Sequence, residues 1–158
     1  MQFTVVQRFA CSPETYWSRS RGPEFEAALA TAADVHVEAL PPRGVVQRTR
    51  VTQNQPMPGV AQKALGIERF RYVQEVESDD SAFLTRWTIV PDVMTDRVTC
   101  RGESRVRASA AGCERVITGT IEVRMALVGG TIEKHIAEQV QRGYQKAEPV
   151  IRRYVEGA

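Results

Sequence analysis

Long apolar runs are missing from this sequence, and metal-binding residues are scarce. No stretch approaches the ~18–20 apolar residues that a membrane span requires. The N-terminus lacks a basic segment followed by an apolar run, so we expect no secretory signal. Only two histidines and three cysteines occur in 158 residues. Neither histidine has a second histidine or a cysteine at ligand spacing, so we expect no metal and no cofactor. The odd, widely separated cysteines favour reduced thiols and a cytoplasmic protein.

An excess of one charge is also missing. The 21 basic and 19 acidic residues leave a net charge of +2 and are spread along the chain. Nucleic-acid binding requires a basic surface that follows the phosphate backbone, so we expect no nucleic-acid partner. Hydrophobic residues make up 42% and charged residues 25% of the chain, which is typical of globular proteins. We therefore expect one domain over residues 1–158.

The N-terminal part predicts one strand and two short helices. Residues 2–10 are rich in Phe, Thr and Val, as strands are. Ser12-Pro13-Glu14 combines a capping hydroxyl, a proline suited to a first helical position, and an acid near the positive end of the helix dipole. A second, alanine-rich helix is expected over residues 24–33.

The middle of the chain alternates with period two and is interrupted by turn residues, which predicts antiparallel hairpins. Its six expected strands are 35–40, 45–54, 67–77, 82–90, 97–108 and 113–127. A long helix follows, with Gly130 as its N-cap and Glu133 at its third position. Its apolar stripe runs from Ile132 to Tyr154, and Pro149 is expected to kink or weaken the last turns.

The first long hairpin tests which side chains share a face. Centring its turn between Asp79 and Asp80 places Tyr72 opposite Trp87 and gathers the apolar residues on one side of the sheet. A one-residue slip would mix apolar and charged side chains. The pattern therefore predicts one apolar face and one wet face.

The second long hairpin gives the same separation. Centring its turn between Ala110 and Ala111 pairs Cys100 with Ile121 on the apolar face. Opposite charges and threonines then pair on the other face, as expected for a wet surface. The register also sets Gly102 opposite Gly119, which suggests a sharp bend where the sheet coils.

The junction at 123–133, a strand followed by Gly-Gly and a helix, is similar to that of the DUF2505-type branch of the START-like, SRPBCC helix-grip superfamily. The order of elements along the chain also resembles that superfamily, which includes polyketide cyclases, pollen allergens of the Bet v type and lipid-transfer domains. The resemblance implies an α+β fold in which a curved seven-stranded antiparallel sheet surrounds a long C-terminal helix. Two short helices would separate the first two strands. It also implies a ligand cavity between the sheet and the final helix.

The side chains expected to line this cavity are aromatic, aliphatic or uncharged polar. They are Phe70, Tyr72, Gln74, Phe83, Thr85, Trp87, Cys100, Ser104, Ile121, Met125, Ile136, Val140 and Tyr144. Ordinary core packing is the competing interpretation for each of them. The long connection at 55–66 is a candidate gate through Met57, Val60 and Leu65, with a well-packed surface loop as the alternative.

We therefore expect a protein that binds or carries a hydrophobic small molecule, either a lipid or a polyketide-like compound. An aromatase/cyclase-like enzyme is the first alternative. The side chains expected to line the cavity include no Asp, Glu, His or Lys, so we assign no catalytic residue. A protein-interaction module with a vestigial cavity is the second. Stable membrane insertion is not expected, and a homodimer is left open.

Overall fold

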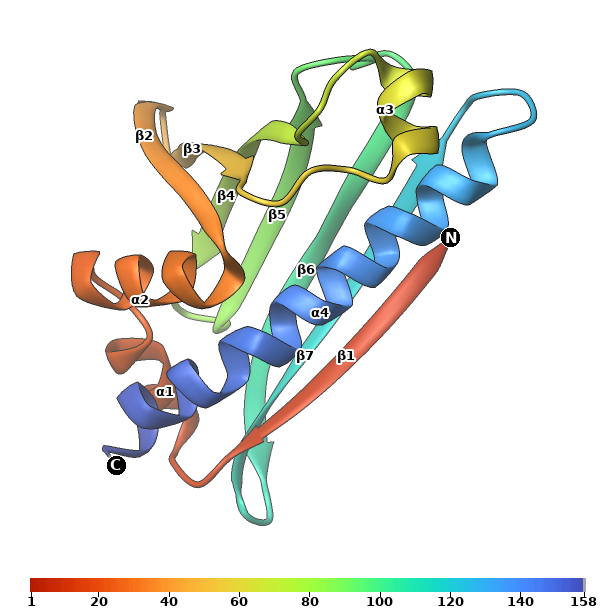
Figure 1. Cartoon of the computed structure of the whole chain (residues 1–158). Helices are drawn as coiled ribbons and strands as arrows, with labels where there is room; N and C mark the ends of the chain where they lie inside the picture. The colour runs from red at the N-terminus through yellow and green to blue at the C-terminus, as the bar shows by residue number, and fades with distance from the viewer. Residues whose placement is uncertain (158) are drawn as a thin grey trace.

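The computed structural model describes residues 1–157, which form a curved sheet, a long helix and three short helices (Figure 1). The strands are β1 (Gln2–Phe9), β2 (Val35–Arg43), β3 (Val46–Gln53), β4 (Arg71–Asp79), β5 (Leu84–Pro91), β6 (Val98–Ser109) and β7 (Gly112–Val123). The helices are α1 (Pro13–Arg19), α2 (Pro23–Ala33), α3 (Gly59–Leu65) and α4 (Gly129–Glu156).

All seven strands belong to one antiparallel sheet in the order β1-β7-β6-β5-β4-β3-β2. The helices α1 and α2 carry the chain from β1 at one edge to β2 at the other (Figure 1). The long helix α4 crosses the concave face. The α+β helix-grip architecture expected from the sequence is therefore confirmed.

The local signals at the first short helix act as expected. Pro13 occupies the start of α1, and the Ser12 hydroxyl accepts a hydrogen bond from the backbone N–H of Thr15 at 3.1 Å. This contact satisfies one of the N–H groups that a helix start leaves without a partner.

The β6–β7 register is confirmed, with Cys100 opposite Ile121 and Gly102 opposite Gly119. The predicted β4–β5 register is wrong, because Tyr72 pairs with Pro91 and not with Trp87. The turn is longer than expected: β4 ends at Asp79 and β5 begins at Leu84.

The Asp79 carboxylate explains this longer turn. It accepts hydrogen bonds from the backbone N–H groups of Ser81 and Ala82, and Phe83 then takes a positive φ of 48°. The partner of Tyr72 moves four positions along β5. An even shift keeps every side chain on its expected face, because the strand period is two.

The junction between β7 and α4 also differs from expectation. The strand ends at Val123, and Gly129 lies inside α4 after an N-cap at Val128, so Gly130 is not the cap. A Cβ on Gly129 would collide with the backbone carbonyl of Val123, so this close approach requires glycine. Glu133 makes a different contact from the one expected: its carboxylate accepts the Val123 N–H at 2.9 Å.

The helix α4 continues past Pro149 to Glu156, beyond the stripe expected to end at Tyr154. Pro149 is exposed on this helix. Proline has no backbone N–H to donate, so the carbonyl one turn earlier in α4 lacks its helical partner. That carbonyl is free to accept a hydrogen bond from water.

Two apolar clusters lie between the sheet and the helices. The larger one contains Trp87, whose ring lies 6.2 Å from that of Phe3. Both rings lie against the facing glycines, since a Cβ on Gly102 or Gly119 would come within 2.5 Å of one of them. The smaller cluster joins β1, α1, α2 and the end of α4, and it includes Phe9, Tyr16, Phe25, Ile151 and Val155.

Candidate functional site

The helix α4 covers only part of the concave face. Its backbone packs against β7 and β1, and further along against α1 and α2. The inward side chains of β1 and β7 are accordingly buried: Phe9 is 1% exposed, and Ile117 and Ile121 are fully buried. We call the inner faces of β1 and β7 the closed half.

The inner faces of β4 and β5 are less completely covered, and we call them the open half. Alternation and pairing direct Tyr72, Gln74 and Val76 of β4 inward, together with Thr85 and Ile89 of β5. All five are half-buried, although they lie on the same face as the core. The open half therefore combines an inward position with accessible surface.

Tyr72 shows this combination most clearly. Its surroundings are dry enough that burial raises the pKa of its hydroxyl, and Cys100 and Tyr144 raise it further. The side chain nevertheless retains accessible surface and makes no hydrogen bond within residues 1–157. A side chain that is enclosed by protein and still accessible is what a ligand-site wall contains.

Several predicted site residues come together in the larger cluster, which includes residues of both halves. Ile136, Val140 and Tyr144 of α4 pack into the larger cluster with Met125, Ile121, Cys100 and Trp87. Phe70 lies beside Tyr72, with ring centroids 5.5 Å apart. The Trp87 indole N–H is buried without a hydrogen-bond partner in the described chain.

Phe83 does not join this group. Its ring packs against Trp17 at 5.6 Å in the smaller cluster. The longer hairpin turn removes Phe83 from β5 and places it at the end of the sheet near α1. The structure therefore separates Phe83 from the other expected lining residues.

Cys100 and Cys113 behave as small buried hydrophobes, whereas Cys11 is half-buried. Burial raises the pKa of Cys100 to about 12. Burial likewise raises the pKa of Cys113 to about 12, and the neighbouring Cys11 contributes. Cys11 and Cys113 approach to 3.9 Å between their sulfurs, and all three thiols are free. A high thiol pKa leaves little reactive thiolate at neutral pH.

One charged side chain points inward that the sequence-based list did not contain. Arg115 of β7 donates from Nε to the Ser104 hydroxyl at 2.8 Å and from Nη1 to the Gln7 amide oxygen at 3.4 Å. Its guanidinium also lies 5.5 Å from the centre of the Tyr144 ring. Ser104 is thus buried beside a cation, not only beside apolar groups.

A sequence signal for Arg115 existed. The β6–β7 register that sets Ser104 opposite Ile117 also sets Val106 opposite Arg115. Alternation then places Arg115 on the same face as Ile117. The next inward-facing pair of the β6–β7 hairpin therefore contains Arg115, the charged residue that the sequence-based list did not include.

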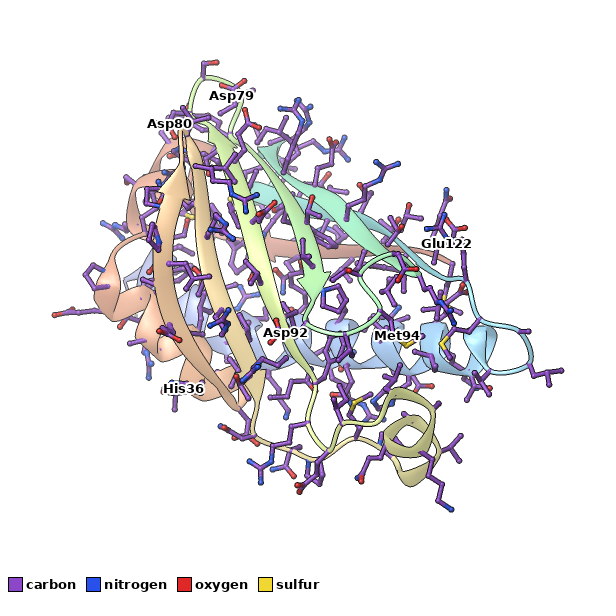
Figure 2. The ribbon with its side chains drawn as sticks, turned by 90° about the horizontal axis from the view of Figure 1, so that it is seen from above. His36, Asp79, Asp80, Asp92, Met94 and Glu122 are labelled. Atoms are coloured by element: carbon purple, nitrogen blue, oxygen red, sulfur yellow. The ribbon has the colours of Figure 1, made fainter. Side chains whose placement is uncertain are left out.

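The connection between β3 and β4 contains α3, which lies on the same side of the sheet as α4 (Figures 1 and 2). Met57 is buried, with 5% of its surface exposed, and Leu65 packs against the larger cluster. Val60, in contrast, is 64% exposed. Two of the three expected gate residues therefore contact the interior. The gating role itself stays a prediction.

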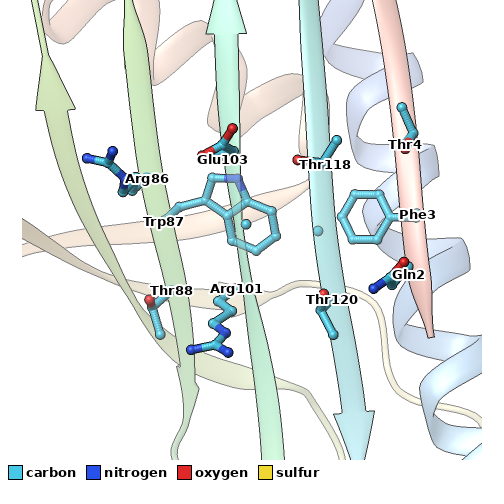
Figure 3. A pocket seen from close by; sticks show the side chains of 12 residues that line it. Gln2, Phe3, Thr4, Arg86, Trp87, Thr88, Arg101, Glu103, Thr118 and Thr120 are labelled. Carbon is cyan, nitrogen blue, oxygen red and sulfur yellow. The ribbon is translucent and has the colours of Figure 1, made fainter.

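A separate hollow of about 490 Å³ lies on the outer face of the sheet (Figure 3). Outward side chains of β1, β5, β6 and β7 surround it, with the facing glycines among its lining. The charged and polar members are Gln2, Thr4, Arg86, Thr88, Arg101, Glu103, Thr118 and Thr120. Phe3 and Trp87 also line this hollow, so it combines a charged, hydroxyl-rich wall with two aromatic residues.

Acidic side chains lie apart on the sheet (Figure 2). Asp79 and Asp80 lie at the hairpin end, whereas Asp92 lies toward the opposite end of β5. Within residues 1–157, no three His, Cys, Asp or Glu side chains are close enough to hold a metal ion. None of the described helices has the length and hydropathy needed to cross a bilayer.

The family described as "Protein of unknown function (DUF2505)" matches residues 4–155, and the chain belongs to this family. The resemblance noted at the 123–133 junction is thereby confirmed. No curated protein matches the chain in sequence.

Several solved structures share the fold. The protein TTHA0849 from Thermus thermophilus is similar with a TM-score of 0.70 and 18% identity, covering 99% of this chain and 98% of that one. The Zhui aromatase/cyclase from Streptomyces sp. R1128 has a TM-score of 0.66 and 16% identity, covering 99% and 92%. Ara h 8.0201 has a TM-score of 0.71 and 13% identity, covering 100% and 99%. At these identities the likeness establishes the fold of the chain as helix-grip and START-like.

Proposed function

We propose that this protein binds or carries a hydrophobic small molecule between the open half of the sheet and α4. The observation that carries the proposal is the accessibility of inward side chains on β4 and β5, where a solid core would leave none. Tyr72, Val76 and Ile89 supply apolar surface there. Removing such surface from water stabilises a complex by roughly 25 cal/mol per Å² before the costs of association.

Polar groups in the same region support a ligand over simple packing. The Tyr72 hydroxyl makes no hydrogen bond within residues 1–157. The Trp87 indole, which extends from β5 over Gly102 and Gly119 toward the closed half, has an N–H that is buried without a partner in the described chain. Buried polar groups ordinarily find partners. A bound molecule with an oxygen acceptor would satisfy these donors and fix its own orientation.

Native mass spectrometry of the gently purified protein tests the proposal directly. We expect a co-purifying apolar species that is lost on denaturation. In parallel, the neutral fluorophore N-phenylnaphthylamine should brighten when titrated with the ligand-free protein. Failure of both measurements would overturn the proposal.

Two adjacent substitutions locate the site. Ile89→Trp fills the open half and should abolish fluorophore binding. Thr88→Trp fills the outer hollow from the opposite face of the same strand and should leave binding unchanged. The reverse result would move the site to the outer hollow and contradict our assignment.

A further inference from the structure

Arg115 is a cation held between the sheet and α4 without a counter-charge. Its strand neighbours on the same face, Cys113 and Ile117, are both fully buried. The Ser104 hydroxyl and the Gln7 amide oxygen accept its hydrogen bonds. The Tyr16 hydroxyl also lies close by: burial raises the pKa of Tyr16, and the nearby Arg115 partly offsets that rise. Ser104 is 5% exposed and Gln7 is 2% exposed, so the arginine is anchored by groups that the fold itself has buried.

The anchoring uses only part of the guanidinium. Nε and Nη1 donate hydrogen bonds, whereas Nη2 donates none within residues 1–157. No carboxylate of the described chain forms an ion pair with Arg115. Arginine has five N–H donors in a planar fork and does not lose its proton in proteins. Donors suited to an anion therefore remain free.

Arg152 provides the contrast within the same chain. It also lies over an aromatic ring, that of Phe9 at 5.1 Å, but it pairs with both Glu148 and Glu156 at 2.8 Å. Arg152 is thus neutralised twice, whereas Arg115 has no carboxylate partner among the described residues; Arg153, which lies over Tyr154, also has none there but is exposed to solvent. Arg115 itself is half-buried. A partly desolvated charge without a counter-charge is unfavourable, so the missing carboxylate at Arg115 calls for a functional explanation.

Tyr144 connects Arg115 to the open half. Its ring lies beside the guanidinium. Its hydroxyl is close enough to Tyr72 to raise the pKa of that residue. Tyr144 is therefore near both Arg115 and Tyr72.

We propose that Arg115 receives the carboxylate of an amphipathic acid whose apolar body occupies the open half. This inference rests on the proposed function and adds the chemical class of the ligand. The planar fork of arginine matches a carboxylate in a bidentate arrangement. Ser104 and Gln7 act as positioning residues, because they hold the guanidinium and leave its outer donors free.

A dansyl-labelled fatty acid and its methyl ester test this assignment, because they differ only in the charge. We expect the wild-type protein to bind the acid roughly tenfold or more tightly than the ester, as charge-assisted hydrogen bonds allow. Arg115→Met should remove this preference by weakening the binding of the acid to the level of the ester. Arg115→Lys keeps the charge without the fork and should retain part of the preference.

Arg101→Met is the matched control, since Arg101 is an exposed arginine on the outer face of β6. It should keep the full preference for the acid. A thermal melt without ligand checks that Arg115→Met is folded: it should still melt cooperatively, at a temperature somewhat below that of the wild type, because the buried Ser104 and Gln7 lose a hydrogen-bond partner.

Three results would overturn the inference. Equal binding of acid and ester to the wild type would show that the site does not recognise a carboxylate. The proposed hydrophobic site would then still stand. A preference that survives in Arg115→Met would place the anion elsewhere. Binding of neither probe would reject the proposed function itself, and the inference with it.

Discussion

The closed and open halves of the concave face are built from the same sheet, yet they differ in what covers them. In the closed half, α4 lies directly on β1 and β7, and side chains such as Ile117 and Ile121 are fully buried. In the open half, Tyr72 and Ile89 point the same way and keep accessible surface.

Under the proposed function, this difference would separate stability from ligand binding within one fold. Dense packing in the closed half supplies most of the apolar burial that holds α4 in place. The open half contributes less to folding, which leaves its side chains free to contact a ligand. The two halves should therefore respond differently to the same substitutions.

Ile121→Ala and Ile89→Ala make the same chemical change in the two halves. We expect Ile121→Ala to lower the free energy of unfolding by about 3 kcal/mol or more, because a fully buried side chain leaves a cavity. Ile89→Ala should cost roughly 1–2 kcal/mol, since its side chain is already half-accessible. Urea denaturation of both variants measures this. Equal losses would show that the open half is packed as tightly as the closed half.

Gly102 lies on β6 between the two halves, and Gly143 lies on α4. A Cβ on Gly102 would run into the Thr118 carbonyl and lie 2.5 Å from the Trp87 ring, so Gly102→Ala should destabilise by about 1–3 kcal/mol. Gly143 has open space around its Cα, and Gly143→Ala should stabilise α4 by roughly 0.5–1 kcal/mol. Thermal melts of the two variants should shift in opposite directions, and a shift in the same direction would contradict this packing.

The buried thiols predict how stability depends on pH. Burial raises the pKa of Cys100 from its ordinary value of 9.0 to about 12, so the folded protein holds this proton more tightly than the unfolded chain. The resulting stability is complete below pH 9 and is lost as the pH rises toward 12. Urea denaturation from pH 8 to pH 10.5 should show this decline. Cys100→Ala should reduce the slope, and an unchanged slope would exclude the Cys100 thiol as its source.

Tyr72→Phe should produce the smallest change in stability. The Tyr72 hydroxyl makes no hydrogen bond in the described chain, so its removal should change the free energy of unfolding by less than about 0.5 kcal/mol. A thermal melt without ligand checks this value. A loss of about 1 kcal/mol or more would reveal a structural hydrogen bond and weaken the case that this hydroxyl is available to a ligand.

Much of the fold could be predicted because its signals are local or repeat along the chain. The cap at Ser12 and the β6–β7 register follow from residues close in sequence. The β4–β5 register could not be read in the same way, because the Asp79 side chain lengthens the turn by contacts with the backbone. The start of α4 escaped prediction because the approach of Val123 to Gly129 depends on how the chain folds back.

Most of the candidate site followed from strand alternation, which placed Tyr72, Trp87 and Cys100 on the inner face. Phe83 was misplaced because the lengthened turn carried it to the smaller cluster beside Trp17. Arg115 was overlooked because an arginine in an apolar hairpin is ordinarily a surface residue, although the register placed it inside.

The sequence by itself determined which side of each strand faces inward. Side chains alternate with period two along a strand, so a pairing error of four positions leaves every side chain on the same face. Only the tertiary structure decided how that inner face is divided into a closed and an open half. The division depends on where α4 lies across the sheet, and this position results from contacts between residues far apart in sequence. The same contacts bury Gln7 and Ser104 beside Arg115, and they leave its guanidinium without the carboxylate that α4 provides to Arg152.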